Sequence, residues 1–267
     1  MRVLVSGAAG SIGQVACAGL ADRGHDIAGL DLVVRPASLA VDDWHVADCT
    51  DPAAVDAVMS DTAPDAVIHL AGIPTETSLP DSLHSHVVST GALLEAMVGH
   101  GVSRIVYASS NHAVGRTPRT DLLGNDVRTR PDTCYGVAKV AAEALLSMYV
   151  DRHRIDAVAC RIGSFLAEPE TRRSLSTWLS HDDAVRMFDA ALTCPDPGFA
   201  VIYGISANTR GWWDLGPGHA IGYHPEDDAE AWASRVEATP ADEDDRAEAE
   251  HVGGPYATAR FERPLFG

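Results

Sequence analysis

The chain has 267 residues, 46% of them apolar, and a formal net charge of −18. This length allows one large domain or two small ones, and the negative charge argues against nucleic acid or an anionic membrane as a partner. The sequence has no long apolar run and no signal-peptide pattern, and its five scattered cysteines form no C-x-x-C pair, so we expect a cytoplasmic protein with free thiols. His84 and His86 have no nearby third ligand, so no metal site is expected.

Strand and helix patterns alternate along the first part of the chain. Short apolar runs predict buried strands at 2–6, 25–31, 66–72, 104–110 and 157–163. Between them, helices are predicted at about 14–23, from Asp51 and Pro52 onward, at about 82–99, and at about 135–152. The alternation predicts an α/β fold, a Rossmann-type doubly wound parallel sheet with helices on both faces.

The pattern changes after residue 163. An amphipathic helix is predicted at 180–193 and one more strand at about 199–204, which we expect to return to the sheet. The remaining residues are irregular and rich in Gly, Pro and Trp. We therefore divide the chain into a nucleotide-binding core, 1–163, and substrate-binding cap elements, 164–267, over the carboxyl ends of the strands, where open α/β sheets bind ligands.

A glycine-rich turn lies between the first strand and the first helix. Gly7, Gly10 and Gly13 follow the G-x-x-G-x-x-G spacing, which lets the backbone approach a pyrophosphate at a helix N-terminus. Asp31 ends the second strand, where an acid bonds the ribose hydroxyls and repels a 2′-phosphate, so NAD is favoured over NADP. Asp48 is a candidate adenine contact, although a purely structural role is equally compatible with its position.

The chain has one lysine, Lys139, and nineteen arginines. An acidic surface poor in lysine is compatible with adaptation to concentrated salt and with coding bias, and both interpretations stay open. Lys139 stands four residues after Tyr135, so the two share one helix face. A nearby ammonium and the positive nicotinamide ring both favour the phenolate, so the two would lower the tyrosine pKa toward that of a useful base. Ser109 and Ser110 end the preceding strand and could polarise a substrate oxygen.

Taken together, these motifs resemble the extended branch of the short-chain dehydrogenase/reductase superfamily over residues 2–163. The resemblance implies a catalytic triad of Ser110, Tyr135 and Lys139. It also implies further cofactor contacts, in which Lys139 holds the nicotinamide ribose and the others are Ser11, Ile12, Cys49, Leu70, Ala71 and Gly72. One departure is His86, which replaces the asparagine that relatives often carry.

A narrower resemblance, to the uronate dehydrogenases, covers nearly the whole chain. It rests on the S-S-N-H run at 109–112 and on the segment 173–183, RSLSTWLSHDD. It implies NAD-dependent oxidation of C1 of a cyclic hexuronic acid, glucuronate or galacturonate, to the aldarolactone, with Tyr135 as general base. The implied substrate contacts are Ser110, Asn111, His112, Ser164 and Arg173, with Thr75 replacing a serine contact whose place is taken by Pro74, and Phe165 near the nicotinamide.

Two other functions stay open at this stage. The first is a sugar epimerase or dehydratase of the same branch, which would recycle its NAD and release no NADH. The second is a non-catalytic NAD sensor, although such relatives usually lack the tyrosine or the lysine, and both are present here. We expect a small-molecule substrate and a homo-oligomer, and the sequence does not rank the two uronates.

Overall fold

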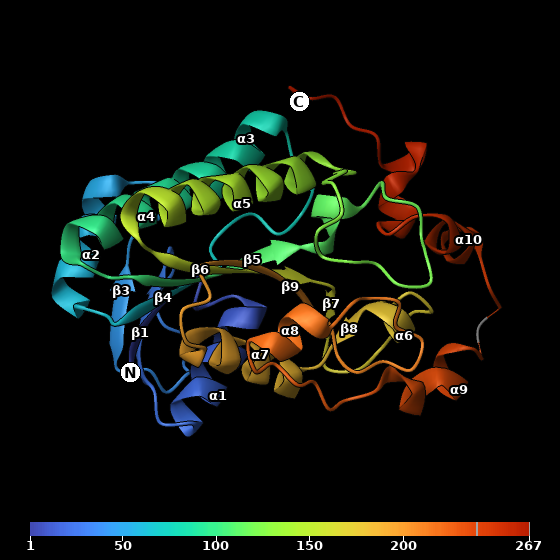
Figure 1. Ribbon diagram of the computed structural model, residues 1–267, viewed down its shortest axis with the longest axis horizontal. Coiled ribbons are helices and arrows are strands. Elements are labelled where there is room, and N and C mark those ends of the chain that lie inside the picture. The colour runs from blue at the N-terminus through green and yellow to red at the C-terminus, as the bar shows by residue number, and fades with distance from the viewer. Residues whose placement is uncertain (239, 267) are drawn as a thin grey trace.

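The computed structural model describes residues 1–238 and 240–266 (Figure 1). Its centre is a seven-stranded sheet in the order β3-β2-β1-β4-β5-β6-β9, with every neighbouring pair parallel. The strands are β1 (Arg2–Ser6), β2 (Asp26–Asp31), β3 (Asp43–Val46), β4 (Ala66–His69), β5 (Arg104–Ser110), β6 (Asp156–Ile162) and β9 (Phe199–Gly204). The predicted doubly wound parallel sheet is confirmed.

Helices cover both faces of this sheet (Figure 1). One layer holds α1 (Ser11–Asp22) and α7 (His181–Thr193), and the other holds α2 (Pro52–Thr62), α4 (Ser89–His100) and α5 (Cys134–His153). The strands are apolar on both sides because both sides are covered: Val3, Leu4 and Val5 of β1 are fully buried, and they contribute alternately to the two cores.

Two helices begin earlier than the sequence predicts. α1 starts at Ser11 rather than near residue 14, because the glycine turn leads directly into it with Gly10 as N-cap. The helix expected at about 82–99 is preceded by α3 (Leu79–Leu83), capped by Ser78 with Pro80 in its first turn, and by η1 (His84–Val88), one π-helical segment that runs into α4. Such π segments frequently accompany functional sites.

The last hundred residues build the region beside the carboxyl ends of β5, β6 and β9 (Figure 1). Its elements are β7 (Ser164–Phe165), β8 (Trp178–Leu179), α6 (Ser174–Thr177), α8 (Gly216–Ala220), α9 (Ala233–Val236) and α10 (Glu243–Glu250), with the 3-10 turns η3 (Ala229–Trp232), η4 (Gly254–Ala257) and η5 (Ala259–Phe261). A further 3-10 turn, η2 (Asn111–Val114), lies earlier in the chain and follows β5 directly. The division at residue 163 stays a prediction. Among the described residues, no helix has the length and apolarity needed to cross a membrane.

The C-terminal segment after α10 is fastened to the loop that follows η2. The Val252 N–H donates to Thr117 O at 3.0 Å and the Gly253 N–H donates to Gly115 O at 2.8 Å. Pro118 and His251 form an antiparallel bridge beside these bonds. The segment therefore lies against the loop that continues from Asn111 and His112.

Candidate active site

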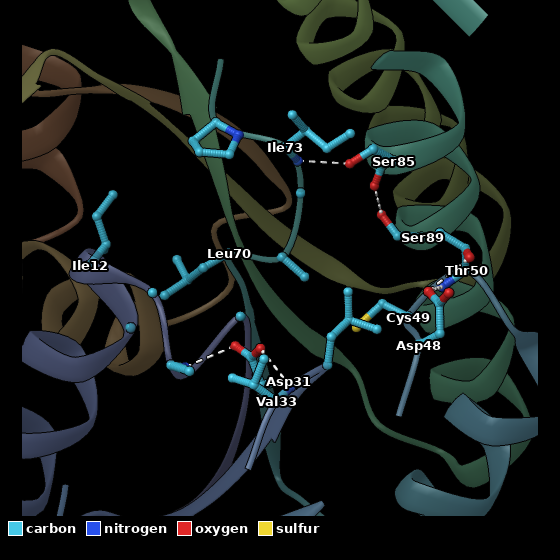
Figure 2. A pocket seen from close by; sticks show the side chains of 18 of the residues that line it. Ile12, Asp31, Val33, Asp48, Cys49, Thr50, Leu70, Ile73, Ser85 and Ser89 are labelled. Atoms are coloured by element: carbon cyan, nitrogen blue, oxygen red, sulfur yellow. Dashed lines mark hydrogen bonds between the residues drawn. The ribbon is translucent and has the colours of Figure 1, made fainter. Parts of the chain in front are cut away.

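A cavity of about 630 Å³ opens at the carboxyl ends of β1, β2 and β4 (Figure 2). β1 lies between β2 and β4, which is the point where the strand order reverses and where doubly wound sheets bind dinucleotides. Most of the predicted cofactor residues line this cavity, namely Gly7, Gly10, Ser11, Ile12, Gly13, Asp31, Asp48, Cys49, Leu70, Ala71 and Gly72. The wall also contains neighbours that the motifs do not predict, including Val33, Thr50, Ile73 and Ser85.

The glycines of the turn are required by close backbone contacts. Gly7 has a φ of +73°, and a Cβ there would lie 2.6 Å from the Ala71 nitrogen. A Cβ on Gly13 would lie 2.3 Å from the Gly7 carbonyl oxygen. The turn therefore brings the bare backbone and the first N–H groups of α1 to the cavity wall, a cradle that suits the pyrophosphate of a dinucleotide.

Asp31 is held in place by the backbone at the end of β2. One carboxylate oxygen accepts a hydrogen bond from the Ala9 N–H at 2.9 Å, and the other accepts one from the Val33 N–H at 3.3 Å (Figure 2). The carboxylate faces the cavity beside the glycine turn. This position fits the predicted contact with the adenosine ribose hydroxyls of NAD.

Replacement of Asp31 by Ala is therefore expected to relax the cofactor preference. Without the negative charge, a 2′-phosphate is no longer repelled, and we expect the ratio of kcat/KM for NADP⁺ to that for NAD⁺ to rise by about tenfold or more. The ratio is measured by NADH and NADPH absorbance, with Asp61→Ala on α2 as the control. An unchanged ratio would show that Asp31 does not select the cofactor through the adenosine ribose.

The Tyr135 and Lys139 pair projects from the first turns of α5. Thr133 caps this helix by accepting the Gly136 N–H at 2.9 Å. Glu76 adds a second cap, because its two carboxylate oxygens accept the N–H groups of Cys134 at 2.9 Å and Tyr135 at 3.0 Å. The sequence analysis missed Glu76, since a separation of 58 residues leaves no local signal of this contact.

Lys139 is buried, with 4% of its surface exposed, and its Nζ donates to the Ala108 carbonyl oxygen at 2.7 Å. Burial lowers the pKa of Lys139 to about 7, although Glu143 opposes this shift. Nζ lies 5.3 Å from the centre of the Tyr135 ring. Burial also raises the pKa of Tyr135 to about 12, against a hydrogen bond from Ser110 that lowers it. Desolvation therefore dominates in the protein alone, and the lowering expected from Lys139 and the nicotinamide ring together stays a prediction.

His86 packs directly against the candidate base. Its ring meets that of Tyr135 edge-on, with the centres 5.2 Å apart. Nε2 donates to the Ile73 carbonyl oxygen at 3.0 Å, and Nδ1 is buried without a hydrogen-bond partner among the described residues. A second buried histidine, His69, bonds Ser6 at 2.7 Å. Burial lowers the pKa of both histidines to about 3, so both rings are neutral near pH 7.

Acid is expected to destabilise the fold through His86. The unfolded chain protonates this ring below a pH of about 6.5, whereas the folded protein keeps it neutral down to about pH 3, so stability falls as the pH drops through this range. Asn at position 86 cannot take up that proton. As the pH falls, the free energy of unfolding of the His86→Asn variant should therefore decrease less steeply than that of the wild type, by up to about 1.4 kcal/mol per pH unit. Urea unfolding between pH about 6.5 and about 5 measures the difference.

The control for this experiment is His100→Asn, at the surface end of α4. It removes the same side chain without opening a buried position. Parallel curves of unfolding free energy against pH for the wild type and His86→Asn would contradict the prediction.

Three of the predicted substrate residues, Ser110, Asn111 and His112, lie near Tyr135. Ser110 and Asn111 are buried at the end of β5, and the Ser110 oxygen accepts the His112 N–H at 3.2 Å. His112 Nδ1 lies 2.9 Å from the Asp132 carboxylate, and its ring centre lies 6.0 Å from that of Tyr135. Asp132, another residue that the sequence analysis missed, therefore fixes the orientation of His112.

The remaining predicted contacts are placed less uniformly. Ser164 bonds Thr177 at 2.8 Å, and Phe165 stacks on His181 with ring centres 4.7 Å apart. Thr75 is exposed, next to Pro74, which lines the cavity. Arg173 is ion-paired with Glu248 of α10. These residues stay predictions as substrate or cofactor contacts.

Comparison with known proteins decides the family. The model of the NAD dependent epimerase/dehydratase family matches residues 3–181. The chain belongs to this family. Uronate dehydrogenase from Pseudomonas syringae pv. tomato is 34% identical, covering 97% of this chain and 94% of that protein. Uronate dehydrogenase from Agrobacterium fabrum is 37% identical, covering 99% of this chain and 98% of that protein.

A solved structure extends this likeness to three dimensions. A mutant of uronate dehydrogenase from Agrobacterium tumefaciens, complexed with NAD, superposes with a TM-score of 0.90 at 37% identity, covering 99% of this chain and 98% of that one. Both resemblances drawn from the sequence are confirmed, as are the fold and NAD as the cofactor of this family member. In this chain, the glycine turn and Asp31 in the cavity wall fit the pyrophosphate and the adenosine ribose of that cofactor.

Proposed function

We propose that this protein is an NAD-dependent uronate dehydrogenase that oxidises C1 of cyclic glucuronate or galacturonate to the aldarolactone. The observation that carries the proposal is the cluster of Tyr135, Lys139 and Ser110, with Asn111 and His112 following Ser110. His86 joins this cluster to the dinucleotide cavity, because its ring packs on Tyr135 and lies against Gly72 in the cavity wall. The near full-length likeness to uronate dehydrogenases supports the substrate class.

In the reaction, the C1 hydroxyl loses its proton and C1 loses a hydride. Bound NAD⁺ supplies the hydride acceptor and a positive charge near the phenol. Tyr135 takes the hydroxyl proton, and Lys139 stabilises the phenolate at 5.3 Å from the ring centre. Ser110 donates a hydrogen bond to the substrate oxygen as the carbonyl forms. The ring oxygen stays bonded to C1, so the product is the lactone.

The other side chains hold the sugar. Asn111 offers an amide and His112 a ring nitrogen to the ring hydroxyls, and Asp132 keeps the His112 ring turned toward Tyr135. Arg173 contacts the substrate carboxylate with its guanidinium. A uronate is therefore distinguished from a neutral aldose by one cationic contact and positioned by neutral ones.

The direct test is the absorbance of NADH when the purified protein is mixed with NAD⁺ and either glucuronate or galacturonate, at low and high salt. We expect a rise with at least one acid and a much smaller one with glucose. Absence of NADH with both acids at every salt concentration would overturn the proposal and favour an epimerase or dehydratase, which returns the hydride to its substrate.

We also propose that the protein works in the cytoplasm as a homo-oligomer. All five cysteines are buried free thiols, which suits a reducing compartment. Val98 on α4 and Val137 on α5 are exposed apolar side chains. They belong to the layer of α2, α4 and α5, which would form the contact between subunits. Light scattering of the purified protein tests the association, and a monomer at micromolar concentration would contradict it.

A further inference from the structure

Arg173, the predicted carboxylate contact, already has an anionic partner inside the protein. Its Nη1 donates to a carboxylate oxygen of Glu248 and, at 3.0 Å, to the Val252 carbonyl oxygen. The side chains of Glu248 and Arg173 are 6% and 16% exposed. Burial raises the pKa of Glu248, and Arg173 opposes that shift. The arginine lies at ion-pair distance, and a cation so placed favours the ionised carboxyl.

Neighbouring segments hold the pair in place and connect it with His112. Ser176 donates to the second oxygen of Glu248 at 3.4 Å. A Cβ on Gly254 would lie 2.5 Å from Glu248 and 2.8 Å from Arg173, so the chain passes directly over the ion pair there. Two residues later, the Tyr256 ring meets His112 edge-on with centres 4.8 Å apart. The segment from Glu248 to Tyr256 thus connects the two predicted substrate contacts.

The pairing leaves one edge of the guanidinium for a ligand. Within residues 1–238 and 240–266, every side-chain hydrogen bond of Arg173 leaves from Nη1. The Nε and Nη2 edge of the fork can therefore still take a carboxylate. A bound uronate and Glu248 would then be two anions on one cation, and their mutual repulsion reduces the attraction that Arg173 alone would exert.

We infer that Glu248 is a specificity-determining residue, which limits the preference of the enzyme for a C6 carboxylate over a neutral C6 group. The inference rests on the proposed function, because it concerns the carboxylate of the same substrate. The effect of Glu248 is electrostatic, so it changes the binding of the charged substrate and not that of a neutral one. A role limited to stability would affect charged and neutral substrates equally.

The test compares glucuronate with glucuronamide, whose C6 amide has the same shape and no charge. Glu248→Gln keeps an acceptor for Arg173 and removes the negative charge. We expect the ratio of kcat/KM for glucuronate to that for glucuronamide to rise about tenfold, through a lower KM for glucuronate. The KM for NAD⁺ should not change. Glu250→Gln, which removes an exposed charge from the same helix, should leave the ratio within about twofold.

The outcomes separate the inference from the function it rests on. A folded Glu248→Gln variant with an unchanged or lower ratio, in an enzyme whose wild type oxidises glucuronate, overturns the inference alone. Glu248→Leu repeats the measurement if the Gln variant does not fold, and the same rise is expected. A wild type that forms no NADH from either uronate overturns the proposed function and the inference with it.

Discussion

Tyr135→Phe should lower kcat for uronate oxidation by about 10²–10⁴-fold, the usual contribution of a positioned general base. The variant loses only the phenolic oxygen, and the ring contacts with His86 and His112 remain. NAD⁺ binding should therefore persist, which fluorescence titration can check. NADH formation under saturating uronate measures the loss.

The matched control is Tyr149→Phe, farther along the same helix, where the hydroxyl bonds Glu95 on α4. It removes the same atom about four turns from Tyr135. We expect its kcat to stay within about twofold of the wild type. If Tyr135→Phe kept more than about a tenth of the wild-type kcat, Tyr135 would not be the base.

Arg161→Met should lower the free energy of unfolding by about 3–5 kcal/mol. Arg161 on β6 and Glu143 on α5 form a buried pair, with bonds of 3.0 and 2.8 Å, and Ser109 donates to the same carboxylate at 2.6 Å. Without the arginine, Glu143 is a buried anion that retains one hydroxyl donor. Urea unfolding near pH 7 measures the change in unfolding free energy.

Two controls isolate the cause of that loss. Arg235→Met breaks an exposed pair with Glu168 and should cost less than about 1 kcal/mol. The double replacement Arg161→Met with Glu143→Leu removes both charges, and it should recover part of the lost stability because Glu143 no longer remains as a buried anion. The recovery is incomplete because the buried Lys139 loses the neighbouring carboxylate. A single variant that loses less than about 1 kcal/mol would show that water or rearrangement satisfies Glu143.

The cofactor half of the site could be predicted from the sequence because its signals are local. The glycine turn, the strand before it and the helix after it lie within about twenty residues, and Asp31 ends the neighbouring strand. Gly7, Gly10, Gly13 and Asp31 all line the cavity. In a parallel sheet, adjacent strands place their carboxyl ends together, so local motifs converge without any knowledge of distant contacts.

The substrate half was less predictable because its geometry depends on contacts between distant segments. Glu76 caps the helix of Tyr135, Asp132 orients His112, and Glu248 pairs with Arg173 across 75 residues. A single acidic residue in a chain with 38 Asp and Glu carries no mark of such a role. The raised pKa of Tyr135 in the protein alone could not be predicted for a similar reason, since the degree of burial depends on the packing of several elements.

The sequence by itself determined the layered α/β architecture and the dinucleotide turn, because apolar periodicity and glycine spacing act over short distances. It also singled out Tyr135 and Lys139 as candidate catalytic residues, because their spacing places them on one helix face. Only the tertiary structure decided that α3, a π segment and α4 together bring His86 against Tyr135, and that α10 brings Glu248 to Arg173. Those contacts join charges and rings that are far apart along the chain, and their energies depend on burial, which exists only once the chain has folded.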